Sequence, residues 1–434
     1  MSTFLGMRGN GNWVTNQRPE NWREMILRLY PNGSAPLTAM LSMLGSEATD
    51  DPVFHWWTKN LPDQGGDVSG VYTDAALSSA ATTAGFAEGT TLYFKVAEAV
   101  ADEFHEGHTA MAQKGSDHNY SYIGLVTDVV KNGASSYLAV KLREASSTTY
   151  PITSTDTIDV AGNSNPEGAP MPSALSYDPV EYYNYTQIFR TSLAITDTAR
   201  QTRLRTDEAY QEAKREALEI HAMEMERAFL FGARFSGTGS NGKPQRETYG
   251  LRKFILDHAA DNVDNYQTSV GYGSVGWTAA AGGEKWLNEQ LEIIFRKGSN
   301  EKIGLIGNQG LLAINRLAQT SADVNINPMT VAYGMRVLEW ITPFGTLYLK
   351  THPLFSHRPA LRRDLLVLEP SNLRYRYVRN RDTRFISDPR DNRNTNNSKD
   401  GTEEEFITEA GLEVHHPDTM GYLSGLGLDG TTSA

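Results

Sequence analysis

Residues 207–231, DEAYQEAKREALEIHAMEMERAFLF, contain neither glycine nor proline and are rich in Ala, Glu, Arg, Met and Leu. These residue types favour a helix. Thr206 can cap its first turn and Gly232 ends it. The spacing predicts an opposite-charge pair between Arg215 and Glu219. It also predicts an apolar stripe, formed by Leu218, Ala222, Met225 and Phe229. At 1.5 Å per residue the helix would be a rod of roughly 37 Å, a length suited to a scaffold.

Two strand signals lie before this helix. Residues 53–61 (VFHWWTKNL) and 182–195 (YYNYTQIFRTSLAI) are rich in aromatic and β-branched side chains. We therefore expect an outgoing strand and one long returning strand. Residues 70–91 are mostly Gly, Ala, Ser and Thr and predict an extended connector.

Residues 92–160 predict a compact β-unit between those strands. The clearest signal is a hairpin formed by strands 120–130 and 137–142. Asn132-Gly133 lies between them, and Asn-Gly supplies the positive φ angles of a tight hairpin turn.

The N-terminal segment predicts two short helices. The first has apolar side chains at helical spacing, at Trp22, Met25, Ile26 and Leu29. The second begins at Pro36 and ends at Gly45. Such short helices are unstable alone, so we expect them to dock on this subunit or on a neighbour.

The chain after the long helix predicts a loop over residues 237–250 and then one α+β domain. That domain would contain helices over 284–297 and 309–319 and strands over 303–306, 335–342 and 346–350. The C-terminal part predicts strands over 365–368, 373–378 and 405–414, with a polar loop over 388–400.

The composition excludes several classes of protein. Among 434 residues, 39% are hydrophobic, which is enough to form a core. The formal net charge of −12 is opposite to that of a protein whose whole surface binds nucleic acid. The chain has no cysteine, which excludes disulfides, thiolate metal sites and a thiol nucleophile. No apolar run is long enough to span a bilayer, and no signal peptide is expected.

Motifs that carry chemistry are weak. Residues 271–276 (GYGSVG) match the dinucleotide-binding pattern, but the preceding segment is polar and no βαβ unit surrounds them. His105 and His108 are three residues apart with a glycine between them, unlike the spacing of a helical zinc site. Neither a nucleophile elbow nor a phosphate-binding loop motif occurs. We therefore expect no enzyme activity, cofactor or metal.

Residues 358–393 contain ten arginines and no lysine. Nucleic acid or another anionic partner could bind there, and so could carboxylates of a neighbouring subunit. Five acidic residues in the same stretch and the negative net charge favour subunit pairing. Trp56 and Trp57 are interpreted as core or interface anchors.

The order of these parts resembles the major capsid proteins of tailed bacteriophages, the Hong Kong 97 type. The closest likeness is to a family within that fold whose members carry a small β-domain in the E-loop region. The residues that carry the resemblance are PNG at 31–33, APL at 35–37, FHWW at 54–57, NYTQIF at 184–189 and EIHAMEMERAFLFG at 219–232. NYTQIF ahead of the helix is the most specific of them.

The resemblance implies an α+β fold in six parts. These are an N-terminal arm (1–50), E-loop strands and connectors (51–91 and 161–200), an inserted β-domain (92–160), a peripheral domain with spine helix 207–231 (201–277), an axial domain (278–358), and return strands, polar loop and tail (359–434). No long charged helical leader precedes the arm, so a scaffolding protein is expected to be separate or already removed.

The implied function is a non-enzymatic major capsid subunit that forms pentamers and hexamers of an icosahedral shell around double-stranded DNA. It would assemble in the host cytoplasm with scaffolding, portal and decoration proteins. A cellular nanocompartment shell of the same fold is the alternative, and an intracellular hydrolase with a β-rich substrate-binding insert is a distant one. The expected interface residues are Trp13, Trp22, Trp56, Trp57, Tyr185, Phe189, Arg215, Glu219, Arg374, Arg376, Arg379 and Arg381.

Overall fold

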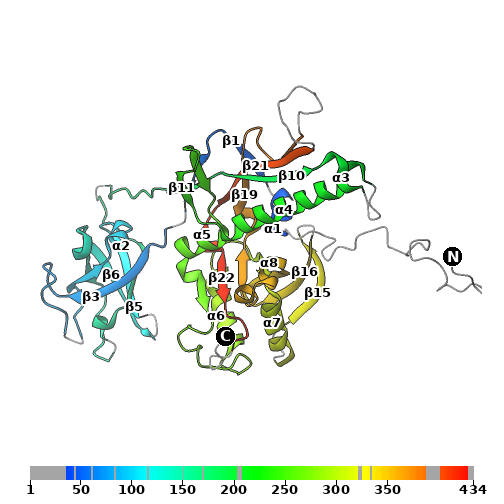
Figure 1. The fold of residues 1–434 in the computed structure, drawn as a ribbon. Coiled ribbons are helices and arrows are strands. Elements are labelled where there is room, and N and C mark those ends of the chain that lie inside the picture. Colours follow the sequence, from blue (N-terminus) through cyan, green and yellow to red (C-terminus); the bar gives the residue numbers. More distant parts are fainter. Residues whose placement is uncertain are drawn as a thin grey trace, which may run out of the picture. The chain divides into compact units, whose positions relative to one another are not determined.

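The computed structural model describes residues 36–43, 45–59, 62–82, 85–114, 117–149, 151–168, 171–202, 208–320, 325–332, 335–387 and 401–428. The chain divides into two compact units, Met1–Thr58 with Glu181–Ala434, and Lys59–Val180 (Figure 1). The helix expected around Trp22, the cap Thr206 and the polar loop 388–400 lie outside the described residues. No helix of the described part is long and apolar enough to cross a membrane.

The predicted long helix is present in the first unit as α4, Ala209–Phe231. It packs on a sheet whose strands run in the order β1 (Ser46–Thr49), β19 (Leu373–Val378), β21 (Thr402–Val414) and β10 (Gln187–Ile195), with β20 (Arg384–Ile386) also paired to β21. The short helices α1 (Pro36–Met43) and α3 (Asp197–Gln201) contact α4. The expected stripe is partly wrong, because Leu218 is 45% exposed. The side chains that α4 buries are Ala217, His221, Met225, Glu226, Phe229 and Leu230.

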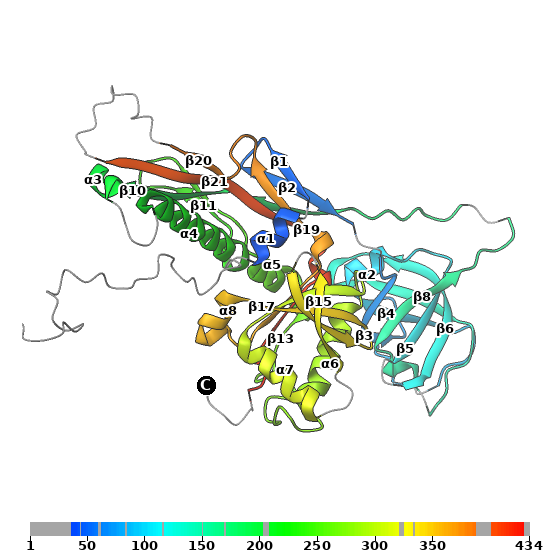
Figure 2. The ribbon, with the colours of Figure 1, turned by 90° about the vertical axis from the view of Figure 1, so that its right-hand side faces the viewer.

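A seven-stranded sheet forms the other half of this unit. It lies away from the end of α4 that is next to α3 (Figure 2). Its order is β13 (Val263–Asn265), β22 (Gly421–Ser424), β18 (Leu365–Leu368), β14 (Glu301–Ile306), β17 (Gly345–Thr351), β16 (Met335–Thr342) and β15 (Asn325–Ala332). Helices α5 (Leu251–His258), α6 (Gly283–Phe295), α7 (Asn308–Thr320) and α8 (Pro353–His357) complete it. The predicted hairpin of β16 and β17 is confirmed.

Both faces of the seven-stranded sheet are buried at β18, which explains why this strand is apolar throughout. Leu366 and Leu368 belong to the core shared with α4 and α5. Leu365 and Val367 point to the opposite face and pack in the core formed with α6 and α7. Strands covered on both faces read as continuous apolar runs.

Two predictions about the first unit are corrected. The segment 182–195 is two strands, because Thr186 separates β9 (Val180–Tyr185) from β10. Strand β9 pairs with β2 (Val53–Thr58), whereas β10 pairs with β21. The expected loop 237–250 contains most of a hairpin, formed by β11 (Phe235–Thr238) and β12 (Pro244–Glu247).

The second unit is a closed barrel. Its strands run in the order β3 (Gly65–Tyr72), β4 (Thr91–Val96), β7 (Tyr137–Leu142), β6 (Asp117–Val130), β5 (His108–Lys114) and β8 (Thr157–Asn163), with the short helix α2 (Glu98–Asp102) beside them. The interior is apolar, with Leu92, Phe94, Leu138 and Ile158 fully buried. Phe104 and Val140 pack in the same cluster.

The barrel confirms one prediction and corrects two. Strands β6 and β7 pair as a hairpin, as predicted. The turn differs, because Gly133 has a positive φ of +53° but Asn132 has a negative one of −150°, and a short 3₁₀ turn follows. The expected connector 70–91 is wrong at its start, where β3 forms part of the barrel wall.

Candidate assembly surfaces

Helix α1 is anchored to α4 from inside the subunit. The carboxylate of Glu226 accepts hydrogen bonds from the backbone N–H groups of Leu37 (2.7 Å) and Thr38 (2.6 Å) and from the Thr38 hydroxyl (2.6 Å). A carboxylate is favourable there, because the first N–H groups of a helix lack intrahelical partners and carry positive partial charge. Leu37, Met40 and Leu41 are at most 1% exposed. Helix α1 is therefore part of the subunit core.

The NYTQIF segment joins the ribbon β2–β9 to the sheet under α4. Asn184 is 1% exposed and donates to the carbonyl of Leu412 (2.7 Å). Its side-chain oxygen accepts from the backbone N–H groups of Tyr185 and Tyr249, both at 2.7 Å. The backbone N–H of Thr186 bonds the carbonyl of Pro52 (2.9 Å). These hydrogen bonds fix the backbone around Thr186, where the chain leaves the β2–β9 ribbon and enters the sheet under α4.

The ribbon β2–β9 has one buried face and one exposed face. Phe54 and Trp56 alternate with exposed His55 and Trp57, and Trp57 is 59% exposed. The indole N–H of Trp56 donates to the carbonyl of Val414 at 3.0 Å. Trp56 is therefore a core anchor, one of the two roles expected of it, and its role at an interface stays a prediction. Trp57 is available on the surface.

Phe189 is likewise a core residue, 5% exposed, with its ring edge-on to Phe229 on α4. Its expected interface role stays a prediction. Tyr185 is half-buried, and Arg215 and Glu219 are on the exposed side of α4. Trp13 and Trp22 lie outside the described residues.

The four arginines of the expected interface were predicted to pair with carboxylates of a neighbouring subunit, but each has a carboxylate partner within this chain. Arg376 lies 2.8 Å from Glu47 on β1 and also contacts buried Glu413 on β21. Burial alone would raise the pKa of Glu413, but His415 and Arg376 hold it below the usual value.

The other three expected arginines have partners of the same kind. Their pairs are Arg374–Glu47 (3.9 Å), Arg379–Asp50 (3.0 Å) and Arg381–Glu409 (2.5 Å). These ion pairs connect β1, β19 and β21 and the turn after β19. They neutralise much of the positive charge that a nucleic-acid site would need.

Buried polar groups were the residues that sequence reasoning missed. His221 on α4 is 1% exposed and lies between Thr191 on β10 (3.0 Å) and Thr408 on β21 (2.7 Å). Burial lowers its pKa, and Glu224 partly opposes this. The one signal in the sequence for the burial of His221 was its spacing, because Ala217, His221 and Met225 follow one another at intervals of four residues on the same helix face.

Lys302 is the second such group. Its ammonium is fully buried and donates to the carbonyls of Ile294 (3.1 Å), Lys297 (2.9 Å) and Thr419 (2.5 Å). Glu369 lies 3.6 Å away. Burial lowers the pKa of Lys302 to about 8, against the effect of Glu369. The hydrogen bonds of Lys302 connect the C-terminal end of α6 to the segment before β22.

The weak chemical motifs do not form sites. His105 and His108 lie ring against ring, 3.6 Å between centroids, at a turn where Gly107 has a φ of +92°. The segment 271–276 is a series of turns. Within the described part of the chain, no three His, Asp or Glu side chains are grouped to hold a metal ion.

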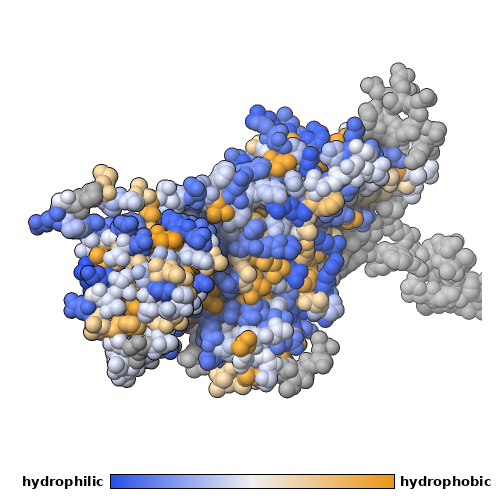
Figure 3. Space-filling view, turned by 90° about the vertical axis from the view of Figure 1, so that its left-hand side faces the viewer, coloured by the Kyte–Doolittle hydropathy of each residue, from blue (hydrophilic) through white to orange (hydrophobic). Residues whose placement is uncertain are grey.

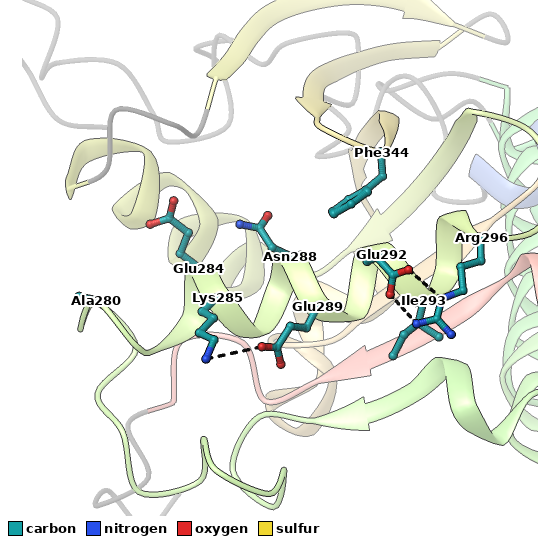
Figure 4. Close-up of a pocket in the computed structure, with 9 residues that line it drawn as sticks. All are labelled: Ala280, Glu284, Lys285, Asn288, Glu289, Glu292, Ile293, Arg296 and Phe344. Atoms are coloured by element: carbon teal, nitrogen blue, oxygen red, sulfur yellow. Dashed lines mark hydrogen bonds and ion pairs between the residues drawn. The ribbon is translucent and has the colours of Figure 1, made fainter. Parts of the chain in front are cut away.

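The apolar surface is divided into small groups. Figure 3 shows, on the face it presents, apolar residues scattered among hydrophilic ones. One groove follows α6 (Figure 4), with a volume of about 660 Å³, and another of about 300 Å³ lies beside the β11–β12 hairpin. Neither gathers the convergent acid, base and nucleophile of a catalytic centre.

Comparison with known proteins agrees with this picture. Residues 7–427 match the family model described as SU10 major capsid protein. A major capsid protein of Pseudomonas phage PaMx41 is 29% identical over 364 residues, which cover 82% of this chain and 78% of that protein. Solved structures from Mycobacterium phages Cain and Bobi share 8% and 9% identity, with TM-scores of 0.47 and 0.46, and each covers 96% of this chain and 98% of its own. Because the family model matches nearly the whole sequence, the chain belongs to the SU10 major capsid protein family.

Proposed function

We propose that this chain is the major capsid subunit of a tailed bacteriophage and that its copies tile an icosahedral shell as pentamers and hexamers around double-stranded DNA. The observation that carries the proposal is the family match over residues 7–427. It favours a phage capsid over a cellular nanocompartment shell. The role is structural, as the family implies.

The parts of the described chain support a shell with the Hong Kong 97 architecture. We assign the spine to α4, the E-loop to the ribbon β2–β9, and the axial domain to the seven-stranded sheet with α6 and α7. The chain leaves the ribbon at Thr58 and re-enters it at Val180, which supports assigning the barrel Lys59–Val180 as the insertion in the E-loop region. This insertion is longer than the expected 92–160.

Shell formation fits a subunit with many small surfaces. Copies in a closed shell meet through several different contacts, each of modest area. The contacts become strong together, because several must break before a subunit leaves. Exposed Trp57 on the ribbon and the exposed side of α4 around Leu218 and Ile220 are candidate contacts. Arg215 and Glu219 lie on that same helix surface.

Further partners follow from the role. A shell that packages DNA needs a portal, and separate scaffolding and decoration proteins are expected with it. Assembly would take place in the host cytoplasm, and the mature location would be the virion. The chain's net charge of −12 would limit adhesion of packaged DNA to the wall.

The test is expression of the full chain, alone and with candidate scaffolding proteins, followed by electron microscopy. Closed shells of uniform diameter with five-fold and six-fold clusters are expected. A truncated variant lacks residues 1–35 but keeps α1, whose side chains belong to the core. It should give folded subunits that do not close shells. A full-length chain that stays monomeric under all these conditions would overturn the proposal.

A further inference from the structure

Two histidines form a turn of the barrel at the point where β5 begins. Residues 105–108 connect α2 to β5, and the backbone N–H of His108 donates to the carbonyl of His105 at 3.3 Å. Gly107, the third residue of this turn, has a φ of +92°, as a type II turn requires. The imidazole rings of His105 and His108 lie 3.6 Å apart between centroids. The turn therefore holds two titratable rings against each other.

The same turn connects three strands of the barrel. The backbone N–H of Gly107 donates to the carbonyl of Val126 on β6 at 3.0 Å, and the carbonyl of Gly107 accepts from the backbone N–H of Ser164, directly after β8, at 2.9 Å. His108 itself pairs with Asn163 on β8. Opening of the turn would therefore release the start of β5 from the strands on both of its sides.

The hydrogen bonds of the two rings determine where each ring carries its proton. Nδ1 of His105 lies 2.6 Å from the carbonyl oxygen of Glu106. Because a carbonyl oxygen can only accept, this nitrogen must be protonated. Nδ1 of His108 accepts the backbone N–H of His105 at 3.3 Å, so this nitrogen must carry a lone pair. His108 is therefore neutral in the closed turn, with its proton on Nε2.

A second proton on His108 is incompatible with this geometry. It would occupy the lone pair of Nδ1 and point at the backbone N–H of His105, so their hydrogen bond would be lost. The new charge would also lie against the ring of His105, and a like charge at that distance opposes ionisation. His108 is 6% exposed, and burial together with the charge of His105 lowers the pKa of His108.

The elements packed around the turn do not offset this charge within the described part of the chain. His105 is the titratable group that acts on His108 there. Glu106 has an exposed side chain and contacts His105 through its carbonyl oxygen. The end of β8 brings the neutral amides of Asn163 and Asn165, which bond each other at 2.8 Å. The acids of α2 and β6 have other neighbours, namely Asp102 with Lys131, Glu103 with the backbone N–H of Gly65, and Asp128 with Tyr137.

We propose that this turn is a pH-sensitive switch in the barrel, closed while His108 is neutral and opened when His108 takes up a proton. In the open turn His108 is in water and has the ordinary pKa of 6.5, whereas the closed turn resists protonation. The population of the open turn should therefore rise as the pH falls below 6.5, by up to about tenfold per pH unit. The inference goes beyond the proposed function, because it concerns the barrel of a free subunit.

Hydrogen exchange of the full chain, measured by mass spectrometry of its peptides, tests the opening of this turn. The reporters are the backbone amides of Gly107 and Ser164, which are both bonded in the closed turn. After correction for the effect of pH on the chemical exchange rate, their exchange should rise about tenfold between pH 7.5 and 5.5. The amides of β4, a strand that does not pair with β5, are the internal reference and should not change.

Three variants identify the titrating group. His108→Asn is the main one, because the side-chain oxygen of asparagine can replace Nδ1 as an acceptor and is not protonated in this pH range. It should stay protected at pH 7.5 and show no rise at pH 5.5. His105→Asn keeps the backbone N–H but removes the second ring, so the rise should remain and begin at a higher pH. His55→Asn, in the other unit, is the control and should behave as the unmodified chain does.

An equal rise in His108→Asn would overturn the proposal, and so would the lack of a rise in the unmodified chain. If His108→Asn does not fold, the measurement on His105→Asn decides. A rise that disappears in that variant would assign the titration to His105 and overturn the role of His108. Shell formation has no part in these measurements on free subunits, so a failure of the proposed function would be seen separately.

Discussion

The carboxylate of Glu226 lies 2.7 Å from Nε2 of His352 inside the subunit, and neither side chain is exposed to solvent. The same carboxylate receives the first backbone N–H groups of α1. One buried acid thus connects three segments that are far apart in the sequence, namely α1, α4 and the start of α8.

Replacing Glu226 should release α1. In Glu226→Ala the N–H groups of Leu37 and Thr38 and the His352 ring lose their partner in a dry environment, so we expect a loss of about 3–5 kcal/mol in the free energy of unfolding. Glu216→Ala, at an exposed position on the same helix, should change it by less than about 0.5 kcal/mol. Urea unfolding measures both, and equal midpoints would contradict the anchoring role.

Asn184 should be the most sensitive position in NYTQIF. Asn184→Ala leaves the carbonyl of Leu412 and the N–H of Tyr249 buried without these partners, at a cost of about 2–4 kcal/mol. Asn241→Ala, in the exposed hairpin turn, is the control and should be nearly neutral. The comparison uses thermal unfolding of free subunits, and an unaffected Asn184→Ala would show that the junction is held by other groups.

Local pattern was enough to predict most elements of the first unit, including α4, α6, α7 and the β16–β17 hairpin. The face of α4 was misplaced because Glu226 and His221 are buried by partners about 190 residues away, Leu37 and Thr408. The spacing of apolar residues predicts only which apolar side chains are buried. Glu226 and His221 are polar, so this spacing did not predict their burial. The burial of Trp56 and Phe189 within the subunit was not predicted for a related reason, since a single sequence does not separate a core aromatic from an exposed one.

The barrel was harder to predict than the rest because its first strand has an unusual composition. Strand β3 reads GGDVSGVY, and Gly, Asp and Ser disfavour strands. The structure explains one of these glycines, since a Cβ on Gly66 would lie 2.5 Å from a methyl of Val100. Tertiary packing selects glycine there, against the local propensity.

Arg376 on β19 and Arg379 directly after it should contribute unequally to stability. Arg376→Ala leaves Glu413, 2% exposed, with His415 as its remaining charged neighbour, and should cost about 2–3 kcal/mol. Arg379→Ala breaks a pair whose members are both largely exposed and should cost less than about 0.5 kcal/mol. Chemical unfolding at low and high salt checks both values. Equal losses for the two variants would favour a role for these residues outside the subunit.

The contact between α4 and its sheet should weaken in acid. Burial lowers the pKa of His221 in the folded state below the unfolded value of 6.5. As the pH falls through 6.5 the unfolded chain takes up a proton that the folded chain resists, so stability decreases. His221→Gln removes this titration, and its melting temperature should fall less between pH 7.5 and 5.5 than that of the unmodified chain. Parallel pH curves for the two proteins would exclude His221 as the titrating group.

Lys302 should give a pH dependence of the same sign in alkali. Its folded pKa of about 8 lies below the ordinary 10.5, so between these values the unfolded chain binds more protons and the contribution of Lys302 to stability rises with pH. Lys302→Met loses that rise and leaves Glu369 and three carbonyls without the ammonium, which should cost about 3–5 kcal/mol at pH 7. Lys297→Met, at a neighbouring exposed lysine, serves as the control.

The measured quantity is the difference in unfolding free energy between each variant and the unmodified chain from pH 7 to 9.5. For Lys302→Met the deficit should grow over that range, because only the unmodified chain gains stability from losing the buried proton, and a constant deficit would mean that Lys302 stays protonated throughout.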